Sequence, residues 1–219
     1  MNTLYNFVSG PLAWLAFILF IGGSLYRLIS LMVLVHKKEK FIYSYMSLKY
    51  GLRSILRWST PFATENMRRH PALTIVTFAF HICLILTPIF LLAHVTLIDE
   101  SWNLSWWTLP DGAAEIMTLI VIAACVFFLV RRLVNPEVQY VTSASDYIIL
   151  GIVAAPFITG FLAYYQWFGY QIFLILHILS GVVMLVASPF TRLSLMLFAP
   201  LTRAYMGSDF GGVRHAKDW

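Results

Sequence analysis

The sequence predicts an all-α membrane protein with five transmembrane helices, and three observations lead to that fold class. Of its 219 residues, 60% are hydrophobic and only 11% are charged, whereas soluble domains carry about 25% charged residues. Five segments are apolar enough to cross a bilayer, which takes about 20 residues each. The basic residues gather on one side of these segments, where they set membrane topology rather than form a nucleic-acid surface.

The predicted spans cover residues 10–35, 72–98, 113–133, 146–167 and 170–198, within one membrane domain over 1–219. Ser145-Asp146 is typical of a helix N-cap and opens the fourth span. Only a short turn around Trp167-Phe168-Gly169 separates the fourth span from the fifth, so we expect these two helices to be antiparallel neighbours. No Lys or Arg precedes the first apolar run, so we expect that helix to be retained rather than cleaved as a signal peptide.

Loop charges predict the orientation. The basic residues of the loops are Lys37, Lys38, Lys40, Lys49, Arg53, Arg57, Arg68 and Arg69, then Arg131 and Arg132, and then Arg203, Arg214 and Lys217. The opposite side has only the acidic residues Asp99, Glu100, Asp111 and Glu115. By the positive-inside rule, the N-terminus lies outside, in the periplasm, and the C-terminus is cytoplasmic. Trp102, Trp106 and Trp107 are then expected at the outer membrane interface.

The 41–58 stretch is predicted to be a cytoplasmic interfacial helix. Lys49, Arg53 and Arg57 recur every four residues among apolar and aromatic side chains, which places the charges on one helical face. A helix of this kind lies on the lipid surface. A docking surface for a soluble partner is the alternative.

The cysteine pattern excludes two kinds of redox centre. Cys83 and Cys125 each lie within an apolar run and form no CxxC or CxxCH motif. The chain therefore carries no covalently attached c-type haem and no iron–sulfur cluster of its own, which would take about four thiolates. We expect both thiols to be small buried side chains.

Three of the six histidines, His81, His94 and His177, lie inside apolar runs, where an imidazole must find a partner. His94 precedes Asp99 by five residues and His177 follows Gly169 by eight, which corresponds to about 8 Å and about 12 Å along a helix. Spans two and five both have their outer ends at those points, so the two imidazoles are expected at similar depth. Two facing imidazoles are what an axially ligated haem iron requires.

His81 lies about 20 Å deeper, which suits a ligand of a second haem that would need another partner. The alternative for each of these histidines is a hydrogen bond to a helix carbonyl. His36, His70 and His215 fall in loop or tail, where we expect them to be solvated.

Four further kinds of residue inside the spans could serve either the structure of the helices or a cofactor site. Arg27 either snorkels to the cytoplasmic interface or pairs with a haem propionate. Glu115 is either a solvated first-turn carboxylate or a proton-handling group for a quinone site. Pro88 and Pro156 are expected to kink their helices, which can open space for a flat cofactor. Gly181 either leaves room beside a porphyrin ring or allows close packing of helices.

With these residues in view, the chain resembles the membrane cytochrome b subunit of respiratory nitrate reductase, its gamma subunit. It is more similar still to cytochrome b subunits of the transmembrane redox complexes of sulfate-reducing bacteria, the high-molecular-weight cytochrome and type II cytochrome c3 complexes. The matching stretches are Ser9-Gly10-Pro11, Tyr26-Arg27, Phe80-His81-Ile82 with His94, Arg131-Arg132-Leu133 through Pro136 to Thr142 and Asp146, and Leu176-His177-Ile178 with Pro189-Phe190 and Arg192-Leu193.

The resemblance implies which residues bind haem b. In the family, two histidines on span two and two on span five hold two haems, and the outer pair carries over onto His94 and His177 as ligands of the haem iron. The inner pair would be His81 and a residue eighteen positions after His177. That position is Leu195, which cannot ligate iron, and its neighbour Met196 points about 100° away on a helix. One haem b is therefore expected, and a second only if His81 finds another partner.

The resemblance also implies a function in a respiratory chain. The chain would pass electrons between the quinone pool, by habitat menaquinone, and extrinsic subunits in the bacterial inner membrane. These would be a cytoplasmic iron–sulfur subunit and a periplasmic multihaem cytochrome c. The alternative is a membrane anchor that has partly or fully lost haem. A transporter is disfavoured because the sequence shows neither internal symmetry nor polar groups converging at midplane.

Overall fold

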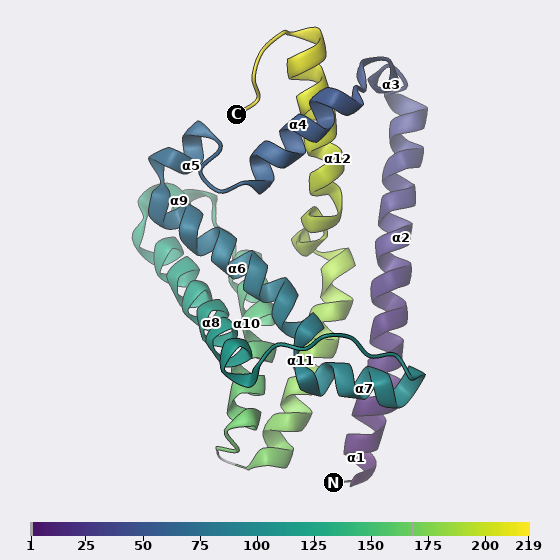
Figure 1. Cartoon of the computed structure of the whole chain (residues 1–219), viewed down its shortest axis with the longest axis vertical. Helices are drawn as coiled ribbons and strands as arrows, with labels where there is room; N and C mark the ends of the chain where they lie inside the picture. Colours follow the sequence, from purple (N-terminus) through teal and green to yellow (C-terminus); the bar gives the residue numbers. More distant parts are fainter. Residues whose placement is uncertain (1, 168) are drawn as a thin grey trace. The chain divides into compact units, whose positions relative to one another are not determined.

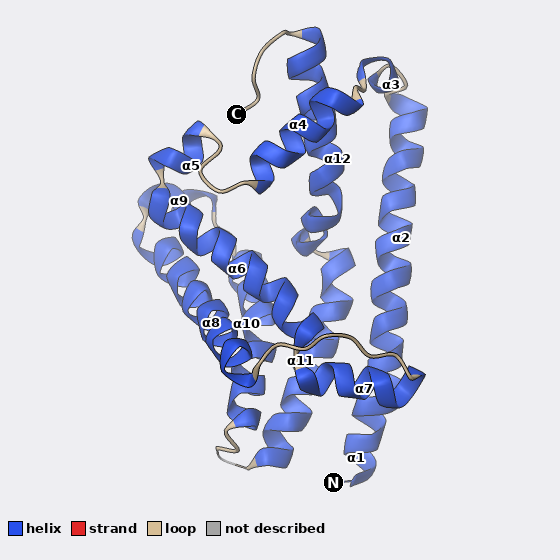
Figure 2. Ribbon diagram, viewed as in Figure 1, coloured by secondary structure: helices blue, strands red, loops and turns tan. Residues whose placement is uncertain are grey.

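The computed structural model describes residues 2–167 and 169–219, which form helices joined by short loops, with no strand in these two ranges (Figures 1 and 2). Five helices in the described residues are long and apolar enough to cross a membrane. They are Thr3–Lys38, Pro71–Phe90, Asp111–Val134, Ala144–Tyr164 and Tyr170–Phe190. The predicted all-α, five-span class is confirmed, and the protein is a multi-pass membrane protein. Phe168, in the predicted turn between the last two spans, lies outside the described residues.

The chain divides into two compact units. Unit 1 comprises Met1–Val8 and Ile75–Met184, and unit 2 comprises Ser9–Thr74 and Leu185–Trp219.

Unit 1 is built around α8 (Asp111–Val134) and α10 (Ala144–Tyr164), which pack against each other. Small and β-branched side chains fill their contact, among them Val121, Ala124 and Val153, which are almost fully buried. Small residues let helix backbones approach closely, which is how helices associate in lipid. Phe80 of α6 (Pro71–Phe90) meets Phe128 of α8 edge to face at 5.3 Å. Unit 1 also holds α1 (Asn2–Phe7), α9 (Pro136–Val141) and most of α11 (Tyr170–Phe190).

The second span is shorter than predicted. The chain leaves the helix at Leu91, whose backbone is extended (φ −69°, ψ 128°), and α7 (Leu92–Trp102) then runs across the end of α6 instead of continuing it (Figure 1). Pro88 removes one hydrogen bond from the last turn of α6, which weakens the helix at that point. A single helix over 72–98 is therefore wrong, because apolar composition continues through the break and conceals it.

The C-terminal end of α6 is capped by residues of the following loop, distant in the sequence. The indole N–H of Trp106 donates to the Ile89 carbonyl at 2.9 Å, and the Leu109 N–H donates to the Phe90 carbonyl at 2.8 Å. Carbonyls in the last turn of a helix have no partner within the helix, so these contacts hold the 103–110 loop against it. Trp106 therefore caps a helix, a role beyond the interfacial position that its sequence context predicts.

The fifth span also ends early. α11 stops at Phe190, and Thr191 is extended, with its hydroxyl accepting from the Leu193 N–H. A 3₁₀ turn (Arg192–Ser194) follows, and Leu195 then begins α12 (Leu195–Ser208). The prediction of one helix over 170–198 is wrong because the threonine cap interrupts an apolar pattern that has no glycine or charge run to mark it.

Unit 2 contains α2 (Ala13–Lys38), α3 (Ile42–Tyr45), α4 (Leu48–Ser59), α5 (Glu65–Arg69) and α12. The predicted 41–58 helix is thus two helices, separated at Met46-Ser47. α4 packs against α12 at small residues: a Cβ on Gly207 would lie 2.4 Å from the Ser54 Cβ. The Ser47 N–H donates to the Ser208 Oγ at 3.0 Å. One face of α4 is therefore occupied by protein, while Leu48 and Leu56 on another face are exposed.

Candidate functional site

His94 and His177 come together in unit 1. His94 lies on α7 and His177 on α11, and the centroids of their half-buried rings are 5.9 Å apart with planes inclined by 16°. Both residues were predicted from the sequence as a pair at similar depth, and their proximity is what that prediction requires.

The separation of the two rings matches that of two axial ligands on one iron. A metal–imidazole bond is about 2 Å long, and each nitrogen lies about 1 Å from its ring centre, so two ligating rings have centres about 6 Å apart. The 5.9 Å between His94 and His177 agrees with that spacing.

Each imidazole is fixed by a carbonyl oxygen through its Nδ1. His94 Nδ1 lies 2.8 Å from the Pro88 carbonyl, and His177 Nδ1 lies 2.8 Å from the Pro156 carbonyl. Because a carbonyl can only accept, Nδ1 carries the proton in both rings and donates it. A neutral imidazole of this tautomer presents an unprotonated Nε2, which is the form that binds a metal.

Both carbonyls belong to prolines that the sequence marked only as kinks. α6 ends two residues after Pro88, so the carbonyl of Pro88 lies in the last helical turn and is free to accept from His94. Pro156 lies inside α10, and its carbonyl accepts from His177 across to α11. These two prolines were expected to kink their helices and open space for a cofactor; what the structure shows is that their carbonyls accept hydrogen bonds from the two imidazoles. The sequence signal was a proline on each of the two helical segments facing the histidines.

Glycine is required where α10 passes His177. A Cβ on Gly160 would lie 2.9 Å from His177 Nδ1 and 3.0 Å from Cε1, closer than side chains normally approach. At Gly181, one turn beyond His177, a Cβ would meet nothing within 4 Å. The ring is thus held tightly on the side of α10, and open space adjoins α11. Sequence reasoning found Gly181 but missed Gly160, whose role depends on a neighbouring helix.

The donor set fits haem better than a metal bound by protein alone. No group of three or more His, Cys, Asp or Glu side chains that could hold a metal ion occurs among the described residues. A structural zinc site takes four protein ligands. A haem iron takes four nitrogens from the porphyrin and needs only two from the protein, which is the number that His94 and His177 supply.

His81 stays outside this pair. Its ring is exposed, and its Nδ1 bonds to the Thr77 carbonyl of its own helix at 2.7 Å. Its expected partner Leu195 begins α12 and is 65% exposed, and Met196 beside it is also exposed. His81 thus has a carbonyl partner for its Nδ1, as His94 and His177 do, but that partner lies in its own helix.

The remaining candidates have individual partners. Arg27 is exposed, with its guanidinium 5.7 Å from the centre of the Phe198 ring. Glu115 accepts a hydrogen bond from the Tyr165 hydroxyl, which the sequence did not indicate, and this bond raises the pKa of Tyr165. Cys83 and Cys125 are buried and unpaired, as predicted.

Comparison with known proteins places the chain in a family. No family model matches it. A protein of Nitratidesulfovibrio vulgaris (strain Hildenborough) is 34% identical over 211 residues, which cover 94% of this chain and 93% of the relative. The chain belongs to the same family as that protein. The relative's name gives no activity, so function rests on the site itself.

Proposed function

We propose that this chain is a haem b-containing membrane subunit of a respiratory electron-transfer complex. It passes electrons between the membrane quinone pool and extrinsic iron–sulfur and multihaem cytochrome c subunits. The quinone that we propose is menaquinone. The observation that carries the proposal is the His94–His177 pair, with rings 5.9 Å apart and both Nδ1 atoms donating to carbonyls. The resemblance to nitrate reductase gamma subunits supplies the biological setting.

The chain's own residues have three tasks in this function. His94 and His177 would hold the iron, and a bound haem would supply one-electron redox chemistry. The Pro88 and Pro156 carbonyls accept from Nδ1, which orients each ring, leaves Nε2 as the unprotonated nitrogen of the neutral imidazole and adds to its basicity. The apolar faces of α10 and α11 keep water away from the centre, which influences its reduction potential.

The orientation belongs to the same proposal. The basic segments face the cytoplasm, where they attract an acidic iron–sulfur subunit, and the acidic segment near Asp99 and Glu100 faces the periplasm and a cytochrome c. With that orientation, the centre lies near the outer face of the bacterial inner membrane.

The decisive experiment is a pyridine haemochrome assay of the complex purified through this chain, with haem b counted per chain. One haem b per chain is expected, and a complex without haem b would contradict the proposal. Limited proteolysis of the chain in its membrane, with protease added to one side and then to the other, would check the orientation independently. Cleavage between residues 36 and 38 is expected only from the cytoplasmic side.

A membrane anchor that has partly or fully lost haem is the second candidate. Leu195, which is exposed and has no group that can ligate iron, favours loss of the inner haem. The same haem count separates the cases: one haem fits a subunit that keeps only the outer centre, none fits an anchor, and two would show that His81 has a ligating partner.

A further inference from the structure

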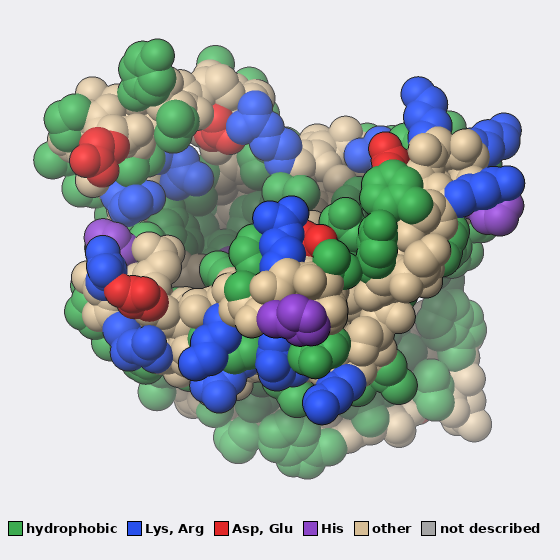
Figure 3. Space-filling view, turned by 90° about the horizontal axis from the view of Figure 1, so that it is seen from above, with side chains coloured by type: hydrophobic (Ala, Val, Ile, Leu, Met, Phe, Trp, Pro, Cys, Tyr) green, Lys and Arg blue, Asp and Glu red, His purple; other side chains and the backbone are tan. Residues whose placement is uncertain are grey.

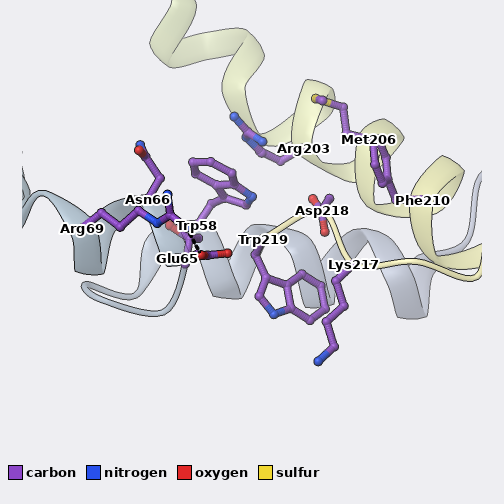
Figure 4. A pocket seen from close by; sticks show the side chains of 11 residues that line it. Trp58, Glu65, Asn66, Arg69, Arg203, Met206, Phe210, Lys217, Asp218 and Trp219 are labelled. Atoms are coloured by element: carbon purple, nitrogen blue, oxygen red, sulfur yellow. Dashed lines mark hydrogen bonds and ion pairs between the residues drawn. The ribbon is translucent and has the colours of Figure 1, made fainter.

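A groove in unit 2 lies apart from the histidine pair. It has a volume of about 670 Å³ and is bordered by the end of α4, by α5, by α12 and by the last residues of the chain (Figure 4). Pockets of a few hundred Å³ suit small ligands or headgroups. Its walls carry the cations Arg69, Arg203 and Lys217 together with Trp58 and Asp218.

Of the three cations in this groove, Arg69 has a carboxylate partner, whereas Arg203 and Lys217 form no ion pair within the described residues. Arg69 is paired with Glu65 at 2.5 Å, and Asp218 accepts a hydrogen bond from Ser54. Arg203 instead stacks on Trp58, with its guanidinium carbon 3.7 Å from the ring centre. No ion pair to Arg203 occurs among the residues that the structure describes. A stacked guanidinium keeps its N–H groups free to bind an anion in its own plane.

Two polar atoms of the same groove also lack partners. The indole Nε1 of Trp58 and the Oδ1 of Asp218 are both buried, and neither finds a hydrogen bond within the described part of the chain. Buried polar atoms are nearly always paired, and an unpaired one is destabilising. Trp58 can only donate and ionised Asp218 can only accept, so a group that satisfies both must offer an acceptor and a donor, as a phosphate ester with a free hydroxyl does.

We propose that this groove binds a phosphate ester that carries a free hydroxyl, such as a glycerophosphate headgroup. The phosphate accepts from Arg203 and from the Trp58 N–H, and the hydroxyl donates to Asp218. Small rotations of Trp58 and Asp218 bring their covered atoms into contact with the ligand. Met206 and Phe210 on the apolar wall contact the carbon skeleton.

The charge around the groove favours an anion over a neutral ligand. Thirteen of the fifteen Lys and Arg residues lie in unit 2, against four of the ten Asp and Glu residues. Arg53 and Arg57 stack on Trp219 at 4.6 and 5.3 Å, next to Asp218 in the chain. Blue Lys and Arg side chains are conspicuous in the view from above, with few carboxylates between them (Figure 3). Such a field attracts phosphate groups, and those of membrane lipids lie at the ends of spanning helices.

Two sources share this chemistry, and one experiment distinguishes them. The full-length chain, in its complex, is reconstituted in nanodiscs of phosphatidylcholine with or without dioleoyl-phosphatidylglycerol, and lipid retained after extraction is counted by native mass spectrometry. A second arm titrates sn-glycerol-3-phosphate into phosphatidylcholine nanodiscs by calorimetry. Binding confined to the first arm assigns a lipid headgroup, and binding in the second arm assigns a soluble ester.

Variants decide whether the groove is the site. Arg203→Gln removes the guanidinium, and Trp58→Phe removes the N–H while keeping a ring for Arg203, so each is expected to weaken binding about tenfold or more. Lys37→Gln removes one positive charge of unit 2 outside the groove and is expected to bind as the parent does. An equal loss of binding in all three variants would mean that binding depends only on the overall positive charge of unit 2, which would overturn the proposal. Unchanged binding by Arg203→Gln, or no binding in either arm, would leave only water in the groove and would also overturn it.

Discussion

The two units contain the same number of histidines but use them differently. In unit 1, His94 and His177 are half-buried, and each imidazole is hydrogen-bonded to a carbonyl. Unit 1 as a whole has two Lys or Arg residues and six Asp or Glu residues. In unit 2, His36, His70 and His215 are exposed among thirteen Lys and Arg residues. His81 of unit 1 is exposed like the histidines of unit 2, so burial distinguishes the His94–His177 pair from the other four. The proposed redox centre thus lies in unit 1, and the proposed phosphate-ester groove lies in unit 2.

The largest effect that would test this contrast is loss of haem. His94→Ala and His177→Ala each remove one of two axial ligands, so each is expected to abolish haem b, measured by the haemochrome spectrum of the purified complex. His36→Ala, an exposed histidine of unit 2, is the matched control and should keep the full haem content. Retention of haem by both unit 1 variants would show that the centre lies elsewhere.

The second-largest expected effect comes from alanine substitutions at two glycines of α10. Gly160→Ala places a Cβ 2.9 Å from His177 Nδ1 and must displace the ring, whereas Gly151→Ala on the same helix meets nothing within 4 Å. Overpacking of this kind costs about 1–3 kcal/mol. We expect Gly160→Ala to lower the midpoint of thermal haem release, followed by Soret absorbance, and to shift the reduction potential. Gly151→Ala should match the parent in both, and a parallel loss in that variant would point to a general weakening of α10.

A corresponding pair in unit 2 should affect stability without affecting haem. Gly207→Ala would place a Cβ 2.4 Å from the Ser54 Cβ and 2.6 Å from the Tyr50 carbonyl, so it separates α12 from α4. At Gly212 the nearest atom is 3.6 Å away, an ordinary contact, which makes Gly212→Ala the control. We expect a destabilisation of about 1–3 kcal/mol, seen as faster proteolysis within residues 36–70, at unchanged haem content. Haem loss in Gly207→Ala would show that the two units depend on each other.

The sequence predicted the five spans and the His94–His177 pair because apolar length and helical depth are local properties. It did not predict the ends of α6 and α11, where a proline without an N–H and a threonine cap end each helix within an apolar run. Nor did it reveal the partners of each imidazole, since Pro156 meets His177 from another helix and Gly160 matters only through that contact. Tyr165 and Glu115 are fifty residues apart in the sequence, and composition alone does not predict which residues of two different helices face each other.

The smallest effect concerns that last contact in unit 1. The Glu115 carboxylate accepts from the Tyr165 hydroxyl and raises the pKa of Tyr165 above its ordinary value, so the bond stabilises the fold while the phenol is neutral. The raised pKa means that this stability is fully present below about pH 10, the unperturbed value for tyrosine, and is lost as the pH rises through the shifted value. Glu115→Gln is expected to lower the pKa of Tyr165, measured by ¹³C NMR of labelled tyrosine in nanodiscs and assigned with Tyr165→Phe. Glu137→Gln, another glutamate of unit 1, should leave the titration unchanged. An unaltered Tyr165 titration in Glu115→Gln would show that the phenol finds a different acceptor, and that Glu115 is free to serve the proton-handling role that its position in the first turns of α8 allows.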